Sequence, residues 1–113
     1  MQVISTNTAP HYKWAERCDG WRLVQADSCS VIQERMPPNT SEVAHFHNQS
    51  RQFFFVLSGS LSIDIDGSLH KLGPEQGLEI SPKLSHRVFN DSAGDVRFLV
   101  FSVPPSQADR VLV

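Results

Sequence analysis

The sequence has little of several features that mark common classes of protein. It contains only two cysteines, Cys18 and Cys29, and their wide spacing does not match a zinc-binding pair. We interpret both as reduced packing residues. It also has no block of basic residues, because ten Lys and Arg are set against twelve Asp and Glu for a net charge of −2. Nucleic acid is therefore not an expected partner.

Long hydrophobic runs are also missing. The first residues, MQVISTNTAPHYKW, have neither the basic start nor the apolar run of about 7 to 15 residues that a signal peptide needs. No later stretch approaches the roughly 18 apolar residues of a membrane span. We therefore expect a cytoplasmic protein with no membrane partner.

Sustained helical periodicity is the third absence. Gly, Pro, Asn and Asp recur at roughly 8- to 12-residue intervals between segments rich in Val, Ile, Phe and Leu, which is typical of an all-β chain. Apolar and polar residues alternate strictly over Leu61–Ile65, and Asp66-Gly67 then favours a tight hairpin turn. Only Ala9–Arg17 is expected to form a short helical turn.

The predicted strands follow from these turns. They are Ser30–Met36, Gln52–Leu57, Leu61–Ile65, Gly77–Ile80, Arg87–Asn90 and Val96–Val103. Many short antiparallel strands must cover their edges, and a sandwich or a closed jelly-roll barrel does this. The 113 residues fit one domain, with an N-terminal arm at about 1–29, a barrel core at about 30–103 and a C-terminal tail at about 104–113.

Two closely spaced histidines are the first candidate site. His45 and His47 are one residue apart, so on a strand their imidazoles point to the same face and can reach one ion. In a chain with five histidines such a pair also arises by chance. Flanking residues favour the metal site: they are PPNT at 37–40, QFFFVLSG at 52–59 and GLEISPKLSHRVFN at 77–90.

With these residues the sequence resembles the cupin superfamily over roughly Val31 to Val103. The matching positions are His45, His47 and Gly59 in the first motif, and Gly77, Pro82, His86 and Asn90 in the second. The resemblance implies a double-stranded β-helix in which His45, His47 and His86 converge on one metal ion. The sequence departs from the pattern twice, since Gln52 takes the place of a glutamate and Lys83 that of a glycine.

Gln52 would alter the charge of such a site. Its carbonyl oxygen can bind a metal but brings no negative charge, so a divalent ion would keep its full +2 and attract an anionic ligand. Gln52 either binds the ion directly or orients a metal-bound water or a substrate oxygen. Imidazole-rich sites suit Zn, Ni or Fe(II), with Mn and Cu as further alternatives.

Strand parity suggests which side chains line the pocket. Phe54 and Val88 should face inward, either as an apolar wall beside the metal or as ordinary core. Arg35 would hold a substrate carboxylate if its side of the strand faces inward, but parity cannot be carried through the Pro37-Pro38 turn. Outward-facing Phe53 and Phe55 would leave apolar surface exposed, and this predicts a homodimer.

Two classes of function remain open. The first is a metalloenzyme that acts on a small oxygen-rich molecule, such as a carboxylate, an enol or a sugar, by dioxygenase, isomerase or lyase chemistry. The second is a module that binds or senses a small molecule without chemistry. The missing glutamate and the lack of an evident general base keep the second class open, and no catalytic residue is assigned.

Overall fold

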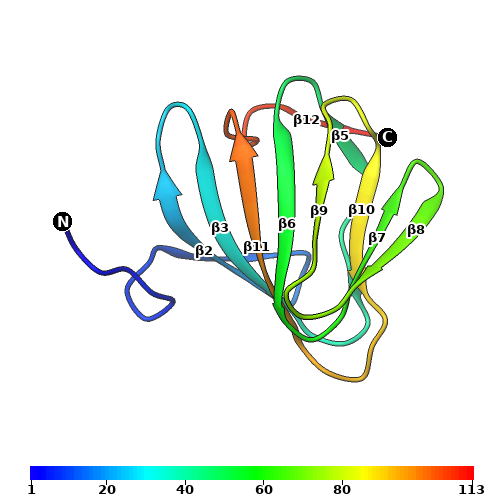
Figure 1. Ribbon diagram of the computed structural model, residues 1–113, viewed down its shortest axis with the longest axis horizontal. Coiled ribbons are helices and arrows are strands. Elements are labelled where there is room, and N and C mark those ends of the chain that lie inside the picture. The colour runs from blue at the N-terminus through cyan, green and yellow to red at the C-terminus, as the bar shows by residue number, and fades with distance from the viewer.

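The computed structural model describes residues 1–113, which form twelve strands in two antiparallel sheets (Figure 1). The strands are β1 (His11–Trp14), β2 (Cys18–Gln25), β3 (Ser30–Met36), β4 (Thr40–Ser41), β5 (His45–His47), β6 (Arg51–Ser58), β7 (Leu61–Ile65), β8 (Ser68–Leu72), β9 (Gly77–Ile80), β10 (His86–Asn90), β11 (Val96–Val103) and β12 (Arg110–Leu112). The predicted all-β class is confirmed. The structure contains no helix long and apolar enough to cross a membrane.

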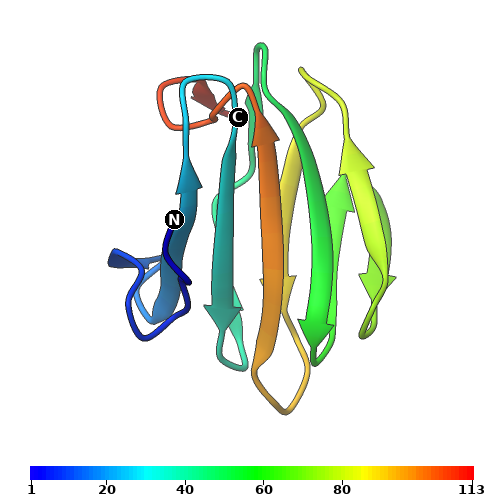
Figure 2. The same cartoon turned by 60° about the vertical axis from the view of Figure 1, so that its left-hand side comes forward.

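The two sheets face each other and enclose the core. One has the strand order β1-β2-β3-β11-β6-β9, and the other has the order β12-β5-β10-β7-β8, with β4 paired to β10. In Figure 2 the orange strand β11 lies between β3 and β6, and the yellow strand β10 belongs to the layer behind them. This is the jelly-roll arrangement that the sequence predicts.

The β7–β8 hairpin shows how local sequence sets the register. Asp66 and Gly67 have φ of 50° and 85°, the left-handed conformation that a tight hairpin turn requires. The Asp64 carboxylate accepts a hydrogen bond from the Gly67 N–H at 3.0 Å. With the turn fixed, Leu61 and Ile63 point into the core and are fully buried.

Apolar side chains from both sheets form one core. Its fully buried members include Met36, Val56, Leu61, Ile63, Val96 and Phe98. On β10 the inward positions are His86, Val88 and Asn90, so a single strand supplies a candidate ligand, a core residue and a structural anchor. The Asn90 amide donates to the carbonyls of Met36 and Gly94, both at 2.8 Å. These bonds tie β10 to the ends of β3 and the loop before β11.

Both ends of the chain add strands to the barrel. The short helical turn expected at Ala9–Arg17 is wrong, because these residues contribute β1, which pairs along its whole length with β2. The Trp14 indole N–H donates to the Asp19 carbonyl at 2.9 Å, which favours the hairpin over a helix. At the other end, β12 pairs with the histidine strand β5, with Arg110 opposite His47.

Candidate metal centre

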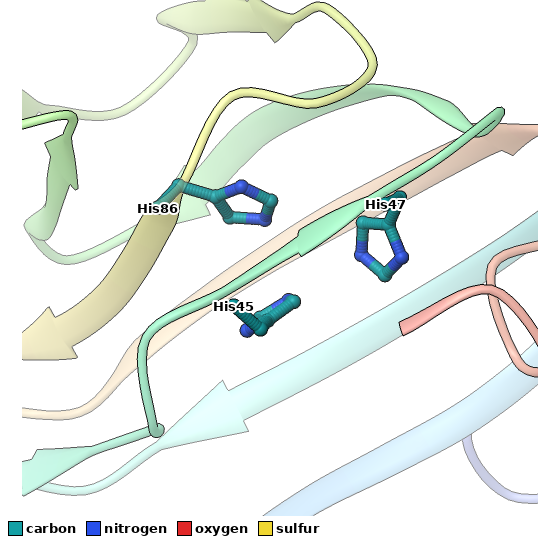
Figure 3. A group of neighbouring side chains, drawn as sticks. All are labelled: His45, His47 and His86. Atoms are coloured by element: carbon teal, nitrogen blue, oxygen red, sulfur yellow. The ribbon is translucent and has the colours of Figure 1, made fainter. Parts of the chain in front are cut away.

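Three histidines from two strands of one sheet meet inside the barrel. His45 and His47 lie on β5, and His86 is the first residue of β10, directly opposite His45 in the ladder. Each is at most 5% exposed, and one ring nitrogen from each lies within 4.8 Å of the other two. Figure 3 shows the three rings turned toward a common space. This arrangement could hold a metal ion.

Hydrogen bonds to the backbone orient two of the rings. Nδ1 of His45 lies 2.9 Å from the Val43 carbonyl, and Nδ1 of His86 lies 3.0 Å from the Leu84 carbonyl. Because a carbonyl only accepts, each Nδ1 carries the hydrogen and each Nε2 keeps a lone pair. Nε2 of His86 and Nδ1 of His47 are buried without any hydrogen-bond partner. Unpartnered buried nitrogens of this kind suit a metal ion, which would use their lone pairs.

Burial keeps the imidazoles neutral. It lowers the pKa of His45 to about 4 and also lowers the pKa of His47 and of His86. The mutual repulsion of the rings and the positive charge of Arg110 act in the same direction on His45. At neutral pH the histidines are therefore in the form that binds metals.

Gln52 completes the inner surface beside the histidines. It lies on β6 and is 6% exposed, and its Nε2 donates to the Ser102 hydroxyl at 3.0 Å on the neighbouring strand. Its Oε1 is buried and has no hydrogen-bond partner. The amide therefore presents an unused oxygen in the cavity, and an oxygen of this kind fits a divalent ion.

The loops that carry the ligands are fixed by the backbone and by the C-terminal segment. Lys83 adopts φ of 73°, a conformation for which glycine is better suited, and its N–H donates to the His47 carbonyl at 2.6 Å. The Asp109 carboxylate accepts hydrogen bonds from three consecutive backbone N–H groups at 48–50, between 2.8 and 3.1 Å. Two distant segments thus hold residues 47–50, which connect β5 to β6.

A cavity of about 420 Å³ opens onto this site. Its apolar wall includes Trp14, Ile32, Phe54, Val88 and Val100. Its polar lining includes Tyr12, Arg22, Glu34, Glu42, Ser102 and Arg110 together with His45, His47 and Gln52. A larger hollow of about 690 Å³, bordered by Gln25, Asp27 and Pro104, contains none of the three histidines. The smaller cavity is therefore the candidate binding site.

The family follows from a sequence match that covers the two histidine strands. A family model described as a cupin domain matches residues 32–102, which is more than half of the chain. The protein belongs to the cupin family. Its double-stranded β-helix is the fold of that family, and the resemblance seen in the two sequence motifs is confirmed.

Relatives of this cupin include two proteins of Streptomyces. It is 34% identical over 70 residues to the polyketide synthase CurC of Streptomyces cyaneus, covering 62% of this chain and 45% of that protein. It is 36% identical over 61 residues to protein SchB of Streptomyces halstedii, covering 54% and 44% of the two chains. The match thus spans less than half the length of each of these relatives.

A solved structure extends the likeness to the whole fold. The polyketide cyclase RemF from Streptomyces resistomycificus superposes with a TM-score of 0.87 at 20% identity, covering 100% of this cupin and 85% of that chain. At such low identity the likeness establishes the fold alone.

The structure places two of the three predicted pocket residues at the cavity and the third away from it. Phe54 and Val88 lie in the cavity wall and are also members of the core. Arg35 does not reach the cavity, and the expectation that it holds a substrate carboxylate there is wrong. Its guanidinium donates to Asp19 at 2.6 and 2.8 Å and to Asp95 at 2.9 Å. Met36, the next residue on β3, is fully buried. Because neighbouring side chains on a strand point to opposite faces, Arg35 lies on the outward face of β3.

Two acidic residues of the cavity were missed by sequence reasoning, which found no evident general base. Glu34 is on the inner face of β3 and accepts a hydrogen bond from the Tyr12 hydroxyl at 3.0 Å. Glu42 lines the cavity beside His45 and accepts a hydrogen bond from the Val88 N–H at 2.9 Å. Burial raises the pKa of Glu34 to about 7 and that of Glu42 to about 8. The alternation on β3 was the available signal, since Glu34 shares a face with Ile32 and Met36.

Proposed function

We propose that this cupin is a small metal-dependent enzyme that acts on an oxygen-rich molecule through its enol or enolate form. One observation carries the proposal: three buried, neutral imidazoles converge, and two of them, His45 and His47, line a cavity that also contains acidic and basic side chains. A cavity that brings metal ligands, proton-transferring groups and cations together suits enolisation. Among dioxygenase, isomerase and lyase chemistries, this favours reactions that begin with loss of a proton beside a carbonyl.

Ring closure of a poly-β-ketone is the specific reaction that we propose. The names of CurC and RemF, a polyketide synthase and a polyketide cyclase, support this choice. A poly-β-ketone alternates carbonyl groups with acidic methylenes, so one of its methylenes can attack a carbonyl farther along the same chain. The cavity wall of Ile32, Phe54, Val88 and Val100 would surround such a folded chain and exclude water from it.

The proposed ligands of the metal are His45, His47 and His86, with Gln52 as a fourth group that binds it directly or through water. Zn, Ni and Fe(II) are the proposed ions, with Mn and Cu as alternatives. When bound, a divalent ion would polarise a carbonyl oxygen and make the neighbouring C–H more acidic. Arg22 and Arg110 line the same cavity and supply positive charge for an anionic substrate or enolate.

A cyclisation assay tests the proposal. Heptane-2,4,6-trione is a short poly-β-ketone that gives orcinol when its first carbon attacks the sixth and water is lost. We expect protein loaded with Zn, Ni, Fe(II) or Mn to accelerate orcinol formation in at least one form, measured by chromatography, with oxygen uptake followed in parallel. His86→Ala should abolish the acceleration, and His70→Ala, on the outer hairpin, should retain it.

The same assay addresses the non-catalytic alternative. Binding of the trione by every metal form, with neither orcinol formation nor oxygen uptake, would favour a module that only binds small molecules. Oxygen uptake without orcinol would instead indicate dioxygenase chemistry at the same centre.

We propose further that the protein is a homodimer. Phe53 and Phe101 lie side by side on the outer face of the larger sheet, with ring centroids 6.1 Å apart and 39% and 37% exposure. Val103, 56% exposed, lies on the strand of Phe101. Light scattering should give about twice the chain mass of 12.7 kDa, and the Phe53→Ser, Phe101→Ser double variant should be monomeric. A monomeric wild-type protein would contradict this proposal.

A further inference from the structure

Glu34 faces the candidate metal centre from the opposite sheet. It lies on β3 of the larger sheet, and the three histidines lie on β5 and β10 of the smaller one. Glu34, His45 and His47 all line the same cavity. A substrate held between the two sheets would therefore meet the histidines on one side and this carboxyl group on the other.

The contacts of Glu34 leave one of its oxygens available. Oε2 accepts the hydrogen bond from the Tyr12 hydroxyl at 3.0 Å, and no protein donor is bonded to Oε1. The Arg22 guanidinium lies 4.4 Å from the centroid of the Tyr12 ring and holds that ring in place by a cation–π contact. Glu34 is thus fixed at one oxygen and open at the other, as a proton acceptor needs to be.

A purely structural carboxylate in this fold has different surroundings. Asp19, on β2, bonds His11, Lys13 and Arg35 at 2.6 to 2.8 Å, and these partners hold its pKa well below the usual range. Glu34 forms no ion pair within 4 Å, and burial raises its pKa to about 7. The charged or titratable groups that share its cavity are Tyr12, Arg22, Glu42, His45, His47 and Arg110. Near neutral pH it can therefore both accept and return a proton.

We infer that Glu34 is the general base that removes the carbon-bound proton in the proposed reaction, and that Tyr12 positions its carboxylate. This inference rests on the proposed function. The carboxylate takes a proton from a carbon atom beside a carbonyl group. The C–H electron pair forms the enolate double bond, and the carbonyl π pair moves to oxygen. The enolate carbon then bonds to a second carbonyl carbon, and protonated Glu34 returns its proton to the new alkoxide, so no oxidant or reductant is needed.

Hydrogen–deuterium exchange of a simple β-keto ester tests the base directly. Metal-loaded protein is added to ethyl acetoacetate in D₂O, and loss of the methylene signal is followed by proton NMR. In Glu34→Gln the protein-dependent exchange rate should fall by about a hundredfold or more, with metal content unchanged. The matched control Glu79→Gln, at an exposed position on β9, should exchange at the wild-type rate. Equal rates in wild type and Glu34→Gln would overturn the inference.

Tyr12→Phe tests whether Tyr12 positions the Glu34 carboxylate. The measurement is the pH dependence of the exchange rate, which a loss of packing alone would not shift. The hydrogen bond from Tyr12 lowers the pKa of Glu34, so its removal should raise that pKa and move the acidic limb of the exchange–pH profile upward. An unmoved limb would contradict the role of Tyr12.

A third measurement separates the inference from the proposed function. Carbon-13 NMR of glutamate-labelled protein reports the titration of each carboxyl group without any substrate. A Glu34 carboxyl that titrates near the ordinary glutamate value of about 4.3 would overturn the inference even if the protein turns over a substrate. Failure of the wild-type protein to retain any metal would instead overturn the proposed function and leave the titration result standing.

Discussion

His86→Ala should abolish stoichiometric metal binding by this cupin. His45 and His47 are neighbours on one short strand, and His86 is the only member of the triad from β10. Two imidazoles without the third leave half of a tetrahedral site to Gln52 and water, so we expect affinity to fall by roughly a hundredfold or more. Elemental analysis of protein purified beside the wild type, followed by calorimetric titration with Zn(II) and Ni(II), measures the change.

Controls separate lost ligation from lost folding. His86 packs against Phe54, with ring centroids 6.3 Å apart, so alanine also opens space in the core. His86→Gln fills most of that space and should bind metal weakly while its thermal unfolding stays near that of the wild type. His70→Ala, on β8, should keep full metal content. Wild-type metal content in both His86 variants would remove His86 from the site.

The strands that local sequence predicts well are those bounded by strong turn signals. Leu61–Ile65 and its Asp66-Gly67 turn form as predicted, because alternation and turn residues agree there. The segment Ala9–Arg17 has no such agreement. Its strand exists because β2 is beside it, with Lys13 opposite Asp19 in the ladder, and a pairing of this kind is not visible in the segment itself.

The residues of the candidate site also differ in how far the sequence predicts them. The histidines could be found because the two motifs preserve their spacing, and Gln52 follows from parity along an uninterrupted strand. Alternation places Glu34 on the same face of its strand as Ile32 and Met36. The Pro37-Pro38 turn breaks the parity count to the histidine strand, so the sequence alone does not show that this face meets the histidines. Tyr12 and Arg110 come from the two ends of the chain, and only the three-dimensional arrangement brings them to the cavity.

Gln52→Glu should tighten the binding of Mn(II) and Fe(II) by roughly tenfold to hundredfold. Glutamate has nearly the same shape as glutamine, and the Ser102 hydroxyl, 3.0 Å from Nε2 in the wild type, can donate to a carboxylate instead. The new negative charge would stand where Oε1 now lies buried without a partner. Its attraction to a hard divalent ion is strong in this enclosed site, although removing the carboxylate from water offsets part of it. Calorimetric titration with each ion, beside an exposed control, Gln25→Glu, measures the effect.

Gln52→Glu should lower the stability of the metal-free protein and raise that of the Mn(II)-bound protein. Without metal, the carboxylate is buried among neutral imidazoles, and the free energy of unfolding should fall by about 1 to 3 kcal/mol. With saturating Mn(II), the tighter binding should more than restore that loss, because a ligand stabilises only the state that binds it. If Gln52 instead orients a water molecule, affinity for Mn(II) should stay unchanged while the metal-free form is still destabilised. The pair of melting curves therefore separates a glutamine that binds the ion from one that contacts it through water.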